Sequence, residues 1–229
     1  MNIRLKQRLM LIAKKVPMCK TVCDIGTDHT YIPIWLIKAS VCEKAVATDV
    51  KLGPIEIAKK NVKKFGLESS VQARVGDGLE PVLDNELDVI IIAGMGGTLI
   101  SRILSDSLAK AKKAGTLLLQ PMNCDEYLRR WLYQNGFEIF DEELAEEGHK
   151  IYNVIVAKWT GEEKPELDDV YNYIGKKLVE NKDPLLDKLL DLKISRLDKA
   201  ICEMDKAGVS SERARKLEQS YLELRAELK

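Results

Sequence analysis

The fold of this chain is decided by the stretch Cys23-Asp24-Ile25-Gly26-Thr27-Asp28-His29. It closes an apolar run that has the pattern of a β-strand, and Gly26 allows a tight turn where the backbone can approach a ligand. Helical spacing begins near residue 31, and a second strand-like run ends at Asp49. A strand, a glycine turn and a helix leading to another strand indicate an α/β domain with a parallel sheet.

The same alternation continues along the chain. Short apolar runs recur at 71–75, 88–93 and 116–120 with helical stretches between them, and two final strands fit 137–144 and 150–159. Because only a turn separates these last two strands, they should form an antiparallel hairpin. We therefore predict a Rossmann-like, seven-stranded, mostly parallel sheet that ends in an antiparallel hairpin. This arrangement is typical of methyltransferases that use S-adenosyl-L-methionine (SAM), whereas NAD-binding Rossmann domains generally lack the hairpin.

The pattern changes after residue 165. Strand signals end, and apolar residues step by three and four along two arms that are interrupted near Gly208: Leu190, Ile194, Leu197, Ile201 and Met204, then Leu217, Tyr221, Leu224 and Leu228. This spacing predicts an antiparallel helical hairpin with coiled-coil packing. We therefore predict two domains, a Rossmann-like methyltransferase domain over 1–160 and a helical coiled-coil domain over 165–229.

Composition and charge limit the possible functions. The 229 residues include 36 basic and 36 acidic side chains, so any RNA-binding surface must come from local clusters of charge. The absence of an apolar run of about 18 residues predicts no membrane span, and the charged N-terminus is unlike a signal peptide. Five cysteines without a C-x-x-C pair favour buried thiols in a cytoplasmic protein. His29 and His149 lack partners at metal-ligand spacing, so no metal is expected.

The turn after the first strand favours SAM over a dinucleotide. Asp28 stands where a G-x-G-x-x-G motif has its second glycine. A carboxylate there would repel a pyrophosphate but is tolerable beside a sulfonium. The residues predicted to contact SAM lie at or just after strand ends and are Asp24, Gly26, His29, Asp49, Asp77, Gly78, Gly94, Met95 and Gly96.

Several of these positions have a purely structural alternative. Asp49 either reaches the ribose diol or caps the next helix, and Asp77 either accepts from the adenine amine or belongs to a plain glycine turn. The glycines of 94–97 either leave room for a planar base or form a flexible loop. His29 either lines the cofactor pocket or makes a local hydrogen bond.

Four motifs occur together in this chain: Asp-Ile-Gly-Thr-Asp-His-Thr-Tyr-Ile-Pro at 24–33, Gly-Met-Gly-Gly at 94–97, Leu-Gln-Pro at 119–121 and His149-Lys-Ile-Tyr. Their combination resembles the bacterial tRNA (adenine(22)-N1)-methyltransferase family, TrmK, and the similarity extends over the whole chain. The resemblance implies that SAM is the cofactor, that tRNA is the partner, and that N1 of an adenine in the D-arm region receives the methyl group.

Adenine N1 carries an in-plane lone pair and needs no strong base, so the enzyme would act mainly by positioning. The product is cationic, and a carboxylate beside the exocyclic amine would stabilise the developing charge. Asp28 is the predicted catalytic residue; alternatively, it binds the SAM amino group or only fixes the turn. Since N1 lies on the pairing edge, the base must leave its helix first. The residues predicted to contact the substrate are Arg4, Arg8, Gly97, Gln120 and Pro121.

Two other function classes remain open from the sequence. One is a methyltransferase of small molecules, for which the appended helices would be unnecessary. The other is a non-catalytic module that binds SAM or RNA. The C-terminal helices either grip tRNA by shape or serve oligomerisation, since a coiled-coil hairpin is as often a structural spacer as a nucleic-acid arm. A monomer is slightly favoured.

Overall fold

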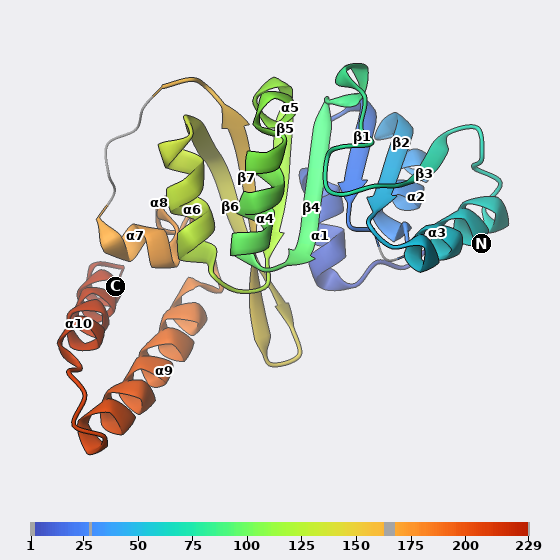
Figure 1. The fold of residues 1–229 in the computed structure, drawn as a ribbon. Coiled ribbons are helices and arrows are strands. Elements are labelled where there is room, and N and C mark those ends of the chain that lie inside the picture. Colours follow the sequence, from blue (N-terminus) through green and yellow to red (C-terminus); the bar gives the residue numbers. More distant parts are fainter. Residues whose placement is uncertain (1–2, 28, 163–167, 229) are drawn as a thin grey trace. The chain divides into compact units, whose positions relative to one another are not determined.

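The computed structural model describes residues 3–27, 29–162 and 168–228 (Figure 1). The chain divides into two compact units, Met1–Lys164 and Pro165–Lys229. The first unit is an α/β domain, and the second unit is helical.

The described residues of the first unit form one seven-stranded sheet with the order β3-β2-β1-β4-β5-β7-β6. The strands are β1 (Cys19–Ile25), β2 (Cys42–Asp49), β3 (Val71–Val75), β4 (Val89–Met95), β5 (Thr116–Pro121), β6 (Phe137–Glu147) and β7 (Lys150–Trp159). The first five strands pair in parallel, and β7 is antiparallel to both β5 and β6. The predicted fold class, with its closing hairpin, is confirmed.

Helices cover both faces of this sheet (Figure 1). They are α1 (Gln7–Lys15), α2 (Tyr31–Lys38), α3 (Leu52–Lys64), α4 (Gly97–Asp106), α5 (Leu108–Lys113) and α6 (Asp125–Gln134). One core joins α4 and α6 to side chains such as Cys23 of β1, and the other joins α1 and α2 to Val22. Successive side chains of a strand point to opposite faces, so β1 contributes to both cores.

Two helices differ from the sequence pattern. Apolar residues have helical spacing over 2–15, which predicts a helix that includes Arg4. In the structure Arg4 lies ahead of the first helix, because Lys6 has an extended backbone and α1 begins at Gln7. Helical spacing also extends over 97–112 and predicts one helix there. The structure divides this stretch at Ser107, whose φ of −126° and ψ of 40° are not helical. The helical spacing of apolar residues continues across Ser107, because Ile103 before the break and Ala111 after it pack into the same core.

The second unit contains α7 (Asp169–Ile174), α8 (Lys176–Glu180), α9 (Leu186–Lys206) and α10 (Glu212–Glu227). Asp191 near the start of α9 forms an ion pair with Arg225 near the end of α10, at 2.6 Å, so the two helices run antiparallel. The predicted helix pair is confirmed, while its supercoiling stays a prediction. No helix in the described residues is long and apolar enough to span a membrane.

Candidate active site

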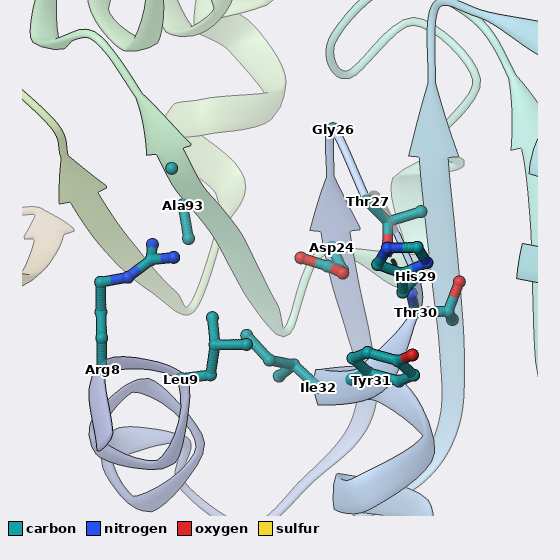
Figure 2. A pocket seen from close by; sticks show the side chains of 11 residues that line it. Arg8, Leu9, Asp24, Gly26, Thr27, His29, Thr30, Tyr31, Ile32 and Ala93 are labelled. Atoms are coloured by element: carbon teal, nitrogen blue, oxygen red, sulfur yellow. Dashed lines mark hydrogen bonds between the residues drawn. The ribbon is translucent and has the colours of Figure 1, made fainter. Parts of the chain in front are cut away.

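A pocket of about 290 Å³ opens where strands β1 and β4 end. The helices that follow β1 and β4 lie on opposite faces of the sheet, so this is the switch point at which α/β sheets bind ligands. The pocket is lined by Arg8, Leu9, Asp24, Gly26, Thr27, His29, Thr30, Tyr31, Ile32, Ala93 and Gly94. Figure 2 shows Arg8 and Asp24 pointing toward the same space from opposite sides.

Asp24 provides a buried carboxyl group in this pocket, with 8% of its surface exposed. Burial raises the pKa of Asp24 to about 6, although a hydrogen bond with Thr27 acts in the opposite direction. A buried carboxylate of this kind is stabilised by a cation that enters the pocket. The geometry therefore suits a ligand that carries an ammonium or sulfonium group.

Gly26 is required by the backbone at the end of β1. Its φ is +74°, and a Cβ there would lie 1.9 Å from the Cε atom of Met95. The Gly26 and Thr27 amides both donate to the carbonyl oxygen of Thr48, at 2.8 and 2.9 Å. These contacts hold the turn after β1 against the ends of β2 and β4, and Met95 acts here by packing against the turn.

His29 lines the pocket and also makes local contacts, so both of its predicted roles are compatible with the geometry. Its ring stacks on that of Tyr31, with 5.2 Å between centroids. Its carbonyl oxygen accepts a hydrogen bond from the Asn61 side chain at 3.0 Å. Asp28, the predicted catalytic residue, lies outside the described residues.

Arg8 is held in place by side chains from distant parts of the chain. Its Nη1 donates to Oε1 of Gln120, and the same oxygen accepts the amide of Gly94 at 3.1 Å. The guanidinium lies 5.2 Å from the centre of the Tyr152 ring, and its Nε is 3.9 Å from Glu147. Gln120 is fully buried, so it orients Arg8 and the end of β4.

The glycines of 94–97 have different structural roles. Gly94 has a φ of +79° at an irregularity in the pairing of β4 with β5, and it lines the pocket. A Cβ on Gly96 would lie 2.8 Å from Asn123 Oδ1, and one on Gly97 would lie 2.3 Å from the Cys124 carbonyl oxygen. Gly96 and Gly97 therefore allow the turn after β4 to pack against the turn that follows Pro121.

The remaining predicted acidic residues lie outside the first pocket. Asp49 Oδ1 accepts the Lys51 amide at 2.7 Å, which is the local turn contact, while Asp49 Oδ2 has no hydrogen-bond partner among the described residues. Asp77 and Gly78 line a second pocket of about 410 Å³. The Asp77 side chain is 61% exposed and lies 3.9 Å from Arg102. Arg4 is exposed and lines neither pocket.

The structure thus gathers Arg8, Asp24, Gly26, His29 and Gly94 around one pocket. Sequence reasoning missed Thr30, which lines this pocket with a φ of +60°, and gave no role to Tyr152. Thr30 belongs to the motif at 24–33 and Tyr152 to the motif at 149–152, so these two motifs could have identified both residues.

Comparison with known proteins gives concordant matches. A family described as "Methyltransferase domain" matches residues 5–155. The chain is 38% identical over 157 residues to the tRNA (adenine(22)-N(1))-methyltransferase of Bacillus subtilis (strain 168), covering 69% of this chain and 66% of that protein. The crystal structure of the B. subtilis m1A22 tRNA methyltransferase TrmK matches with a TM-score of 0.85 and 30% identity over 99% of both chains. Streptococcus pneumoniae Sp1610, in complex with SAM, matches with a TM-score of 0.87 and 32% identity, over 96% of this chain and 99% of that one.

Proposed function

Because the chain belongs to the TrmK family of tRNA (adenine(22)-N(1))-methyltransferases, we propose that it transfers the methyl group of SAM to N1 of adenine 22 in tRNA. The observation that carries this proposal is the pocket at the switch point, where the buried carboxyl of Asp24 faces the fixed guanidinium of Arg8. Sp1610 binds SAM on the same fold, which supports the same cofactor here. A tRNA substrate agrees with action in the cytoplasm.

The residues around the switch point fit SAM in charge and shape. We place the cationic methionine part beside Asp24, since its buried carboxylate is stabilised by a nearby cation. Asp49 Oδ2 is the acceptor for the ribose hydroxyls, and Asp77 with Gly78 faces the adenine edge. Gly26 and Gly94 line the pocket and provide close backbone approach, and Gly96 lets the adjoining turn pack closely. Met95 packs against the turn after β1, and His29 lies at the rim.

Bound SAM supplies an electrophilic methyl group on a positively charged sulfur. The protein has to align adenine N1 with that methyl group and exclude water, because N1 needs no activating base. We place the target base on the Arg8 side of the pocket, where Gln120 fixes the guanidinium. Gly97 and Pro121 shape the adjoining turns, and Arg4 is exposed for contact with a tRNA phosphate. The Asp28 carboxylate accepts from the adenine exocyclic amine and stabilises the forming cation.

A transfer assay tests this function directly. The protein is incubated with methyl-labelled SAM and an unmodified tRNA transcript, and the modified nucleoside is identified and mapped. We expect N1-methyladenosine at position 22 and none in a transcript with guanine at that position. Label that reaches only low-molecular-weight acceptors would indicate a small-molecule methyltransferase. SAM binding without any transfer would indicate a binding module.

SAM affinity should increase with pH between 5 and 7.5. The pKa of Asp24 is raised to about 6 in the ligand-free protein, and a bound cation lowers it, so binding releases a proton. Protonation at pH 5 should therefore weaken binding by about tenfold relative to pH 7.5. Titration calorimetry across this range measures the effect, and Asp24→Asn should bind weakly at every pH. A pH dependence that survives in Asp24→Asn and disappears in His29→Gln would assign it to His29.

We also propose that residues 1–160 and 165–229 act as separate domains. All seven strands and both cofactor-site pockets of the described structure precede residue 160. The fragment 1–160 should therefore fold and bind SAM with an affinity close to that of the full chain. Its kcat/KM for tRNA should fall by at least about tenfold, because an arm that contacts RNA adds binding energy. Undiminished tRNA methylation by the fragment would assign the helical unit to another role.

A further inference from the structure

The segment Gly76–Val82, which follows β3, has no regular secondary structure apart from turns, yet its backbone is tightly held. Within the described range 29–162, its five consecutive carbonyl oxygens from Gly78 to Val82 all accept hydrogen bonds from side chains. The donors are Thr48 Oγ1 to Gly78 (3.3 Å), Lys110 Nζ to Leu79 (2.9 Å), Glu80 (3.0 Å) and Val82 (2.7 Å), and Arg74 Nη1 to Pro81 (2.8 Å).

Lys110 uses the full donor capacity of its ammonium group on this one segment. A lysine ammonium carries three N–H groups, and here three carbonyl oxygens surround it. Lysine side chains on surface helices usually remain in water, because ordering them costs rotamer entropy. The break at Ser107 starts the short helix α5 that carries Lys110. This lysine therefore acts as a fixed cross-link between α5 and the 76–82 segment.

Arg74 holds the other side of the segment. Its guanidinium also pairs with both carboxylate oxygens of Glu86 at 2.7 Å. This two-point contact fixes the orientation of the guanidinium group that donates to the Pro81 carbonyl oxygen. A Cβ on Gly76 would lie 2.8 Å from Pro81, and one on Gly78 would lie 2.8 Å from Ile103. Gly78 also has a φ of +53°. Side-chain hydrogen bonds and close packing on several sides therefore hold the segment in one conformation.

The N–H groups of Gly76, Glu80 and Val82 donate to backbone carbonyl oxygens, which leaves two other polar groups of the segment to consider. Within the described part of the chain, the N–H of Gly78 has no hydrogen-bond partner, and the Asp77 carboxylate is largely exposed. A carboxylate next to a backbone N–H matches the Watson–Crick edge of adenine, which offers an amino donor and the N1 acceptor. Both groups change direction if the backbone of the segment rotates.

We propose that Lys110 and Arg74 are positioning residues that hold the 76–82 segment so that Asp77 and Gly78 read the adenine edge of SAM. This inference rests on the proposed function, in which these two residues face the adenine. Lys110 lines the same pocket as Asp77 and Gly78, but its three N–H groups are bonded to carbonyl oxygens of the segment, and Arg74 does not line this pocket. They act by fixing the carbonyl side of the backbone, which sets the direction of the recognising groups on its other side.

The test compares two ligands that differ only at the adenine edge. S-adenosylhomocysteine has the amino donor and the N1 acceptor, whereas S-inosylhomocysteine has a carbonyl and an N1–H in their places. By calorimetry, the unaltered protein should prefer S-adenosylhomocysteine by at least about 100-fold, since a polar site left unpaired rejects such analogues strongly. In Lys110→Met this ratio should fall to about tenfold or less. Lys110→Arg, which retains a cationic donor, should recover part of it.

Lys113→Met is the matched control. Lys113 lies on the same helix, but its Nζ bonds the Asp84 side chain at 2.6 Å, so its replacement should leave the ratio unchanged. Kinetically, Lys110→Met should raise KM for SAM about tenfold and leave kcat at saturating SAM within about twofold. Thermal melting shows whether each variant is folded, and Lys110→Gln replaces the methionine variant if that one unfolds.

A folded Lys110 variant with an unchanged ratio would overturn the inference, and so would an unaltered protein that binds both ligands equally well. If only the proposed tRNA methylation is wrong, the result is different. The unaltered protein would still prefer S-adenosylhomocysteine, and Lys110→Met would still lose this preference, but the unaltered protein would not methylate tRNA.

Discussion

Replacing Asp28 with asparagine is expected to lower the single-turnover rate of tRNA methylation about 10²- to 10³-fold at saturating SAM. Asparagine keeps the size and one acceptor oxygen but removes the negative charge. Attack by adenine N1 leaves a positive charge on the base, and a preorganised carboxylate stabilises this charge as it develops. Removal of one such electrostatic contact typically costs a rate factor of about that size.

The position of Asp28 in the chain supports this expectation. It stands between Thr27 and His29, which both line the pocket opposite Arg8. An interaction that forms mainly in the transition state lowers turnover more than binding. Asp28→Asn should therefore bind SAM and tRNA with only modest changes in affinity.

Asp24→Asn provides the comparison for this experiment. Asp24 is proposed to contact the cationic part of SAM, so its replacement should weaken SAM binding, and high SAM should restore much of the rate. If Asp28 holds the SAM amino group instead, Asp28→Asn will give this same pattern. SAM affinity and single-turnover rate, measured on both variants, distinguish the two roles. A near-wild-type rate for Asp28→Asn would remove it from catalysis.

The overall fold could be predicted because its signals are local. Most strands of the parallel sheet contain a short apolar run next to a glycine or acidic turn, as in 89–94. The turn at 146–149 is short enough to require an antiparallel hairpin, and the structure has that hairpin as β6 and β7. The limits of the helices were predicted less accurately. The backbone at Lys6 and at Ser107 is not helical, although the apolar periodicity of the sequence continues through both residues.

The candidate site was harder to derive because its contacts connect distant residues. Arg8 and Gln120 are 112 positions apart, and no local pattern indicates that one orients the other. The glycines at 96 and 97 suggested space for a base, whereas the structure places the turn of Asn123 and Cys124 against them. The contacts of Lys110 with the 76–82 segment depend on the path of that segment after β3. The spacing of apolar residues in the sequence does not encode this path.

The second large effect concerns stability and arises from a buried ion pair. Arg129 of α6 and Glu142 of β6 have side chains that are 1% and 0% exposed, and Arg129 Nε lies 2.8 Å from Glu142 Oε1. The same oxygen accepts the Asn153 amide of β7 at 2.9 Å. Burial is the largest single influence and lowers the pKa of Arg129, but Glu142, Asp125 and Tyr133 together outweigh it and raise the pKa, so the arginine stays charged. The pair links α6 to the closing hairpin.

Glu142→Gln should therefore lower the free energy of unfolding by about 1.5–3 kcal/mol, because it removes the charge-assisted hydrogen bond that Arg129 makes with this carboxylate in a fully buried site. Urea denaturation followed by circular dichroism measures the loss. Asp84→Asn is the matched control, since it removes one carboxylate from an exposed pair with Lys113 and should leave stability nearly unchanged.

The double variant Arg129→Met/Glu142→Leu separates the value of the pair from the cost of breaking it. Removing both charges avoids burying a guanidinium that has lost the Glu142 carboxylate, and apolar side chains of similar volume can replace a buried ion pair with little loss. We expect the double variant to recover more than half of the stability lost in Glu142→Gln. The Asn153 amide then lacks its acceptor, which should prevent full recovery. A double variant less stable than Glu142→Gln would mean that the pair stabilises the fold in its own right.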